Sequence, residues 1–195
     1  MFRPLVLIGI SEHELDMDNH SISEAVVARK HLRMSDNLND SLSEDSFFPM
    51  KEPECKRLIE VVDSVIQEHV HPDLRTQNQW AHILDPGEST MIHDHGGGLT
   101  NSTGPVGISW VYYPEVPKHS GNIAWTFEAN AHRMTSEATP EVGKLILFGQ
   151  DVPHFTKKNN SGKRRISISG NAWFDSVPNN FDPGALLNYT GLFRG

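Results

Sequence analysis

The feature that most constrains the fold is a series of short apolar stretches, broken by Gly, Pro and Asn, that runs from Thr76 to Phe174. Stretches of this length between turn-forming residues are typical of β-strands. Many such strands in succession favour a jelly roll or sandwich that closes on itself. We therefore predict a β core with strands at residues 79–84, 90–93, 106–113, 123–127, 144–148, 154–157 and 165–174.

The N-terminal part has a different pattern. Apolar residues recur at helical spacing between Pro53 and Val70, which predicts a helix that packs on the sheet. Ser21 lies three residues before Glu24, a capping-box spacing that predicts the start of another helix, ending near Met34. Residues 1–10 are interpreted as a first strand. We expect these helices to buttress one outer face of the β core.

The length of 195 residues suits a single domain. We divide it into an N-terminal strand and helices (1–75), the β core (76–176) and a C-terminal tail (177–195). The tail could either wrap the domain or dock a second subunit, so a homodimer stays open. With 37% hydrophobic and 22% charged residues, the composition is that of a folded protein.

The net charge of −8 argues against a nucleic-acid partner, because nucleic-acid binders concentrate Lys and Arg. Cys55 is the only cysteine, which excludes an internal disulfide and a thiolate-rich metal site. The apolar N-terminus is followed at once by acidic residues, which suits neither a signal peptide nor a membrane span. We expect a cytoplasmic protein without a membrane partner.

Two histidines form the first half of a candidate metal site. His93 and His95 are two residues apart, so on a strand both side chains point to the same side. Imidazoles at that spacing can share one metal ion. Asp94 could reach the metal instead if the strand were bulged. The glycine-rich segment 96–105 that follows predicts either a flap that orders over the site or a plain connecting loop.

His154 is the candidate third ligand. It follows the stretch 145–148, which is apolar on both faces and therefore predicts a buried strand. A histidine that leaves such a strand is well placed to enter the interior, although an isolated loop histidine would look the same.

The segment 165–171 predicts an anion site. Strand alternation places Arg165, Ser167, Ser169 and Asn171 on one face, and isoleucines on the other. A polar face that points into a barrel needs hydrogen-bond partners, and a buried arginine needs an anion. A carboxylate ligand would meet that need, because guanidinium binds it through two parallel hydrogen bonds.

These residues together resemble a known superfamily. The order is H-x-H at His93 and His95, about sixty residues, His154, and R-x-S at Arg165 and Ser167. It resembles the double-stranded β-helix oxygenases that depend on 2-oxoglutarate and iron(II), over residues 79–174. The chain looks most similar to a small group common in marine bacteria and phages, on the motifs at Trp80, 109–113, 143–148 and 165–171.

The resemblance implies a cupin-like jelly-roll fold and a dioxygenase that uses Fe(II), 2-oxoglutarate and O2. It implies that His93, His95 and His154 are the catalytic metal ligands, and that Arg165, Ser167 and Tyr113 bind 2-oxoglutarate. The reaction would be the hydroxylation of an unactivated C–H bond in a peptide or small molecule.

Two residues depart from the pattern. His95 stands where the broad superfamily carries a carboxylate. Trp110 replaces a glycine, which predicts a reshaped pocket. His82 shares a strand face with Trp80 and either contacts the site or is an ordinary strand histidine.

Two other readings stay open. One is a cupin-like three-histidine dioxygenase that does not use 2-oxoglutarate, which would leave the Arg165–Ser167 pair without a role. The other is a non-catalytic β-sandwich module that binds a metal, such as structural zinc.

Overall fold

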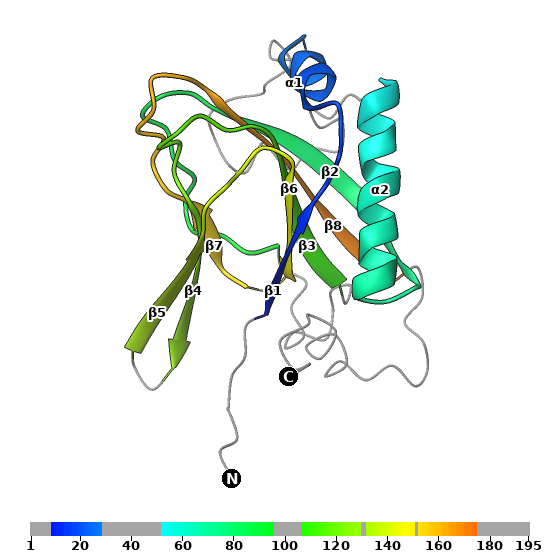
Figure 1. Cartoon of the computed structure of the whole chain (residues 1–195). Coiled ribbons are helices and arrows are strands. Elements are labelled where there is room, and N and C mark those ends of the chain that lie inside the picture. Colours follow the sequence, from blue (N-terminus) through cyan, green and yellow to red (C-terminus); the bar gives the residue numbers. More distant parts are fainter. Residues whose placement is uncertain (1–8, 29–51, 96–106, 130–131, 151, 175–195) are drawn as a thin grey trace.

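The computed structural model describes residues 9–28, 52–95, 107–129, 132–150 and 152–174. These ranges contain two helices and eight strands (Figure 1). In chain order the elements are β1 (Ile10–Glu14), α1 (Asn19–Ala28), α2 (Pro53–His69), β2 (Leu74–Leu84), β3 (Gly107–Glu115), β4 (Ile123–Ala129), β5 (His132–Ala138), β6 (Lys144–Gly149), β7 (His154–Thr156) and β8 (Arg165–Phe174).

The strands form two antiparallel sheets. The larger sheet has the order β1-β6-β3-β8-β2, and the smaller has the order β5-β4-β7. Strands far apart in sequence are therefore neighbours, as when β8 lies between β2 and β3. The prediction of a mainly β fold with helices outside it is confirmed.

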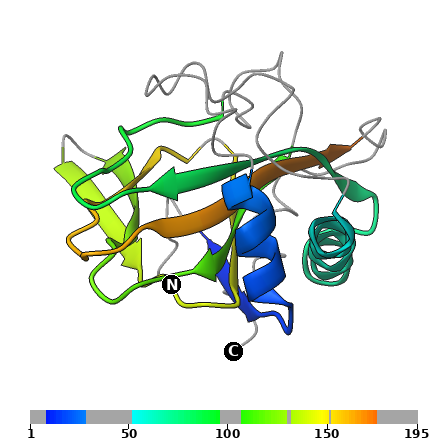
Figure 2. The same cartoon turned by 90° about the horizontal axis from the view of Figure 1, so that it is seen from above.

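Both helices cover the same face of the larger sheet, away from the smaller sheet (Figures 1 and 2). Helix α2 begins with Pro53 in its first turn, where the missing N–H costs no hydrogen bond. It buries one stripe of side chains, as its periodicity predicts: Cys55, Leu58, Ile59, Val62 and Ile66.

The expected start of the first helix was wrong. Helix α1 begins at Asn19, and its cap is the Asp18 side chain, whose Oδ1 accepts a hydrogen bond from the Ser21 N–H at 3.0 Å. Ser21 therefore lies inside the first turn, because an aspartate three residues earlier provides the acceptor that an N-cap needs. The helix is described as far as Ala28; the expected extension to Met34 lies outside the described residues.

The strand predictions need three corrections. The first strand is β1 at Ile10–Glu14, and the expected residues 1–8 lie outside the described part. The stretch 90–93 forms only an isolated bridge at His93. Strand β5 was missed because its sequence, HRMTSEA, is polar and lacks an apolar alternation. The segment 96–105 and the tail 177–195 lie outside the described residues.

The larger sheet separates two groups of buried side chains. One group packs between the sheet and the helices and includes Trp110, Ile166 and Ile168. The other group lies between the two sheets and includes Val111, Tyr113 and Phe148. Alternate residues of β3 and β8 thus serve opposite faces, as strand geometry requires. Among the described helices, none is long and apolar enough to cross a membrane.

Candidate metal centre and anion pocket

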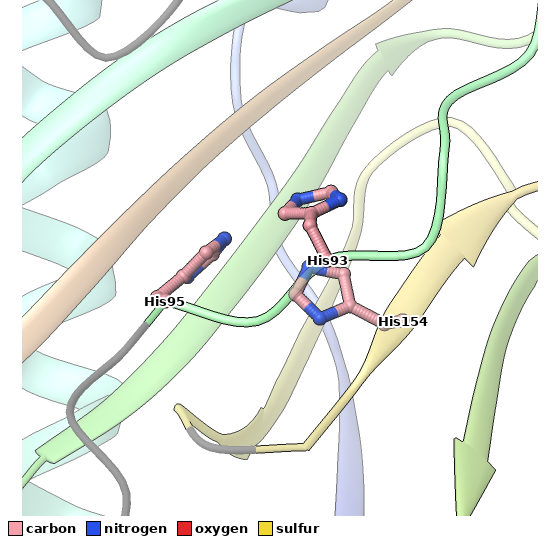
Figure 3. A group of neighbouring side chains, drawn as sticks. All are labelled: His93, His95 and His154. Atoms are coloured by element: carbon pink, nitrogen blue, oxygen red, sulfur yellow. The ribbon is translucent and has the colours of Figure 1, made fainter. Parts of the chain in front are cut away.

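The three predicted histidines come together between the two sheets. Each of His93, His95 and His154 offers a ring nitrogen, and these nitrogens lie within 4.8 Å of one another (Figure 3). His93 and His154 form an antiparallel bridge, with N–H to O=C distances of 3.0 and 2.8 Å. Asp94 is exposed and is not part of the group.

The Nδ1 atom of each ring is engaged by the protein. Nδ1 of His93 lies 2.9 Å from the Met91 carbonyl oxygen, and Nδ1 of His154 lies 2.8 Å from the Val152 carbonyl oxygen. A carbonyl only accepts, so both rings carry their proton on Nδ1. The Nε2 lone pair of each is then available for a metal, the arrangement seen in metal-binding histidines.

Nδ1 of His95 has side-chain partners instead, namely Ser109 Oγ at 2.8 Å and Asn171 Oδ1 at 2.7 Å. Its Nε2 is buried and has no hydrogen-bond partner among the described residues. A buried polar atom without a partner calls for an explanation, and a metal ion supplies one.

Burial keeps the rings of His95 and His154 neutral. Burial lowers the pKa of His95 to about 4. Burial, together with repulsion from His95, lowers the pKa of His154 to about 3. Neutral imidazoles are the form that binds metals, and a set of three nitrogen ligands suits iron, zinc, copper or nickel. The donor set therefore fits an iron(II) ion.

A narrow cavity of about 30 Å³ extends from the histidines to Arg165. Arg165 is only 2% exposed, and its guanidinium donates to the Gly121 carbonyl at 3.0 Å and to Thr156 Oγ1 at 3.2 Å. Within the described residues, its Nε has no hydrogen-bond partner and no acidic side chain forms an ion pair with it. Burial lowers its pKa.

Tyr113 and Ser167 line the same cavity. The Arg165 Cζ lies 5.6 Å from the centre of the Tyr113 ring, and the buried Tyr113 hydroxyl has no hydrogen-bond partner among the described residues. Burial raises the pKa of Tyr113 to about 12, so the hydroxyl stays protonated and can donate. The structure thus brings all six predicted site residues to one cavity.

Two further ring-bearing residues that the sequence singled out, His82 and Trp110, line the cavity. His82 lines the cavity, and its Nε2 accepts a hydrogen bond from Trp80 Nε1 at 2.7 Å. Trp110, expected to reshape the pocket, is also among the residues that line the cavity, and its side chain belongs to the helix-side core and lies over Gly170. A Cβ on Gly170 would come within 2.5 Å of the Trp110 ring, so the indole occupies the space that glycine leaves.

Sequence reasoning did not assign roles to Ser109, Asn171, Gly121 or Thr156. Asn171 could have been found, because it shares the polar face of β8 with Arg165. Gly121 and Thr156 carried no signal: one acts through its backbone carbonyl, and the other ends a three-residue strand.

No protein-family profile and no curated protein matches this chain by sequence. Its fold, however, is shared with solved structures. A prolyl-4-hydroxylase from Pseudomonas putida is 17% identical, with a TM-score of 0.56, over 88% of this chain and 89% of the other. The α-ketoglutarate-dependent epimerase SnoN from nogalamycin biosynthesis is 12% identical, with a TM-score of 0.64, over 90% and 86%.

A prolyl hydroxylase from Trichoplax adhaerens, solved with a hypoxia inducible factor peptide, is 15% identical, with a TM-score of 0.59, over 86% and 84%. At these identities the likeness shows the fold.

Proposed function

We propose that this chain is an iron(II)- and 2-oxoglutarate-dependent dioxygenase that hydroxylates an unactivated C–H bond. The observation that carries the proposal is Arg165, a buried guanidinium without an acidic partner in the described part of the chain, in the same cavity as three convergent histidines. Leaving a buried cation unpaired is costly, so the site favours an anionic ligand. A dicarboxylate with a metal-chelating end would satisfy both parts of the cavity.

Different residues would bind the metal and the co-substrate. His93, His95 and His154 would hold the iron through Nε2, since each Nδ1 is already engaged. Arg165 would pair with the remote carboxylate of 2-oxoglutarate, and the Tyr113 and Ser167 hydroxyls would donate further hydrogen bonds. Three neutral ligands leave the full divalent charge on the metal, which strengthens its attraction for a dianionic co-substrate.

Iron with 2-oxoglutarate and O2 supplies the oxidising chemistry when bound. The protein excludes water and orients the ligands. Phe148 packs against His154 with ring centres 4.8 Å apart, and Trp80 packs against His95 at 5.2 Å. These aromatic contacts restrict the rings and keep the surroundings of the metal apolar.

For the substrate we propose a peptide or a small molecule. Two structural neighbours are prolyl hydroxylases and another acts in nogalamycin biosynthesis, so the shared fold is compatible with both classes. The cavity has room for only about two water molecules, so lining side chains must move to admit 2-oxoglutarate.

The test is succinate formation. Metal-free protein is loaded with Fe(II) and given 2-oxoglutarate and O2, and succinate is measured with and without a panel of peptides and small metabolites. Succinate that requires Fe(II) and is absent from the His154→Ala variant supports the proposal. Tight Fe(II) binding with no binding of 2-oxoglutarate would overturn it, and would favour a three-histidine enzyme of another type.

A further inference from the structure

A chain of side-chain hydrogen bonds connects His95 to the edge of the larger sheet. Asn171 on β8 contacts His95 Nδ1 through its Oδ1, and Ser109 on β3 donates to the same oxygen at 2.7 Å. On its other side, Asn171 Nδ2 donates to Asn78 Oδ1 on β2 at 3.1 Å. The chain therefore crosses three adjacent strands.

The direction of every bond in this chain follows from one backbone group. The N–H of Asn171 can only donate, and it lies 3.2 Å from the Asn78 side chain, so the atom it meets must be the amide oxygen. That oxygen also faces the Asn171 side chain, which must present its NH2 group there. The Asn171 oxygen is thereby turned toward His95.

The tautomer of His95 follows in turn. Oδ1 of Asn171 can only accept, so Nδ1 of His95 carries the proton and Nε2 carries the lone pair. In the other tautomer, two lone pairs would face each other at 2.7 Å. The Ser109 hydrogen is directed at Asn171, so Ser109 also offers a lone pair to His95.

A β-bulge lies directly before Asn78 in β2. Thr76 is opposite Ala172 and Asn78 is opposite Asn171, so Gln77 is an extra residue in β2. In a strand without the bulge, regular pairing would place Gln77 opposite Asn171. From Asn78 to Leu84 the pairing is regular, so Asn78 lies on the same side of β2 as Trp80 and His82, which line the cavity, and the bulge alters only the pairing before it.

We propose that Asn78, Asn171 and Ser109 are positioning residues that fix the metal-binding tautomer of His95, an inference that rests on the proposed function. His93 and His154 are fixed by carbonyl groups two residues away in their own segments. Among the described residues, Nδ1 of His95 has no such local partner. It also stands where the family it resembles has a carboxylate, which has no tautomers; an imidazole in the wrong tautomer would present N–H to the metal.

The direct test reads the tautomer without metal. Long-range ¹H–¹⁵N NMR of the ¹⁵N-labelled, metal-free protein distinguishes protonated Nδ1 from protonated Nε2, and a His95→Gln variant assigns the His95 signals. We expect protonated Nδ1 in the wild type. In Asn171→Leu, Ser109 is released to donate to Nδ1, and we expect protonated Nε2 to appear.

Two substitutions at Asn78 form a matched pair, and this residue is exposed, so the fold should tolerate both. Asn78→Ala frees the Asn171 amide to flip and should give mixed tautomers. Asn78→Asp keeps an acceptor for both bonds and should retain the wild-type tautomer. Asn122→Ala removes an amide that bonds only Glu137 among the described contacts, and serves as the control.

Titration of the metal-free proteins with Co(II) gives the consequence for binding. We expect about 10–100-fold weaker binding in Asn171→Leu, the range typical of partners that orient a metal ligand, and about tenfold in Asn78→Ala. Asn78→Asp and Asn122→Ala should bind like the wild type.

The outcomes separate the two proposals. Protonated Nδ1 in both Asn171→Leu and Asn78→Ala, with unchanged Co(II) affinity, would overturn the positioning role and leave the proposed function intact. If Asn78→Ala and Asn78→Asp lost the same amount of Co(II) affinity, the positioning role would also be overturned. A wild type that has the expected tautomer but binds no Co(II) would overturn the proposed function instead. If Asn171→Leu does not fold, the Asn78 pair decides.

Discussion

The two faces of the larger sheet differ in the kind of side chain that strand β8 gives to each. On the helix side, β8 contributes Ile166, Ile168 and Ala172 to an apolar core. On the side that faces the smaller sheet, here called the barrel side, the same strand contributes Arg165, Ser167, Ser169 and Asn171. Polar atoms of Arg165, Tyr113 and His95 lack protein partners there, within the described residues. One strand therefore supplies stability through one set of alternate residues and binding capacity through the other.

The largest expected effect is on the helix side. Ile168 is fully buried, so Ile168→Ala should lower the free energy of unfolding by about 2–5 kcal/mol, through lost burial and the cavity left behind. Urea unfolding of the metal-free protein measures it. Ser169→Ala, the next residue on the opposite face, should cost less than about 1 kcal/mol. If Ile168→Ala and Ser169→Ala lowered the free energy of unfolding by similar amounts, the contrast between the two faces would not hold.

On the barrel side the expected effect is on binding. Arg165→Ala should weaken 2-oxoglutarate binding by about 10–100-fold, since a hydrogen-bonded ion pair of about 1.5–3 kcal/mol is lost. Fe(II) affinity should be nearly unchanged. Anaerobic calorimetric titration measures both. Arg164→Ala is the matched control, because Arg164 is half-buried and pairs with Glu115 at the end of β3, away from the cavity. Equal 2-oxoglutarate affinity in Arg165→Ala and wild type would exclude the anion pocket.

A smaller effect should appear on lowering the pH. Burial holds the pKa of His95 near 4 and that of His154 near 3 in the folded protein, below the usual 6.5. Between pH 6.5 and 4 the unfolded chain therefore binds more protons, and the metal-free protein should already lose on the order of 1–3 kcal/mol of stability by about pH 5.5. Thermal melts in a chelator measure this loss.

The control for the pH effect is a second histidine substitution. His154→Gln should reduce the fall in melting temperature between pH 6.5 and 4, whereas His20→Gln, on the exposed side of α1, should not. If the melting temperature of both variants falls with pH as steeply as that of the wild type, another group is responsible for the pH dependence.

The sequence predicted the elements whose pattern is local. Helix α2 and strand β8 follow directly from apolar spacing, and the polar face of β8 pointed to the cavity residues. Strand β5 could not be found this way, because its polar residues carry no period and its pairing with β4 is a tertiary contact. The polar face of β8 includes Asn171, but its contact with His95 could not be predicted: Ser109 and Asn171 lie 14 and 76 residues from His95, and only strand register brings the three together.

The backbone bridge between His93 and His154 has a consequence for local unfolding. Each residue donates its N–H to the carbonyl of the other, so neither amide proton can exchange with deuterium unless this pair opens. Opening would separate two imidazoles that the proposed iron holds together. The two amides should therefore share one protection factor, and a metal bound to both rings should raise that protection factor at both positions by the same ratio.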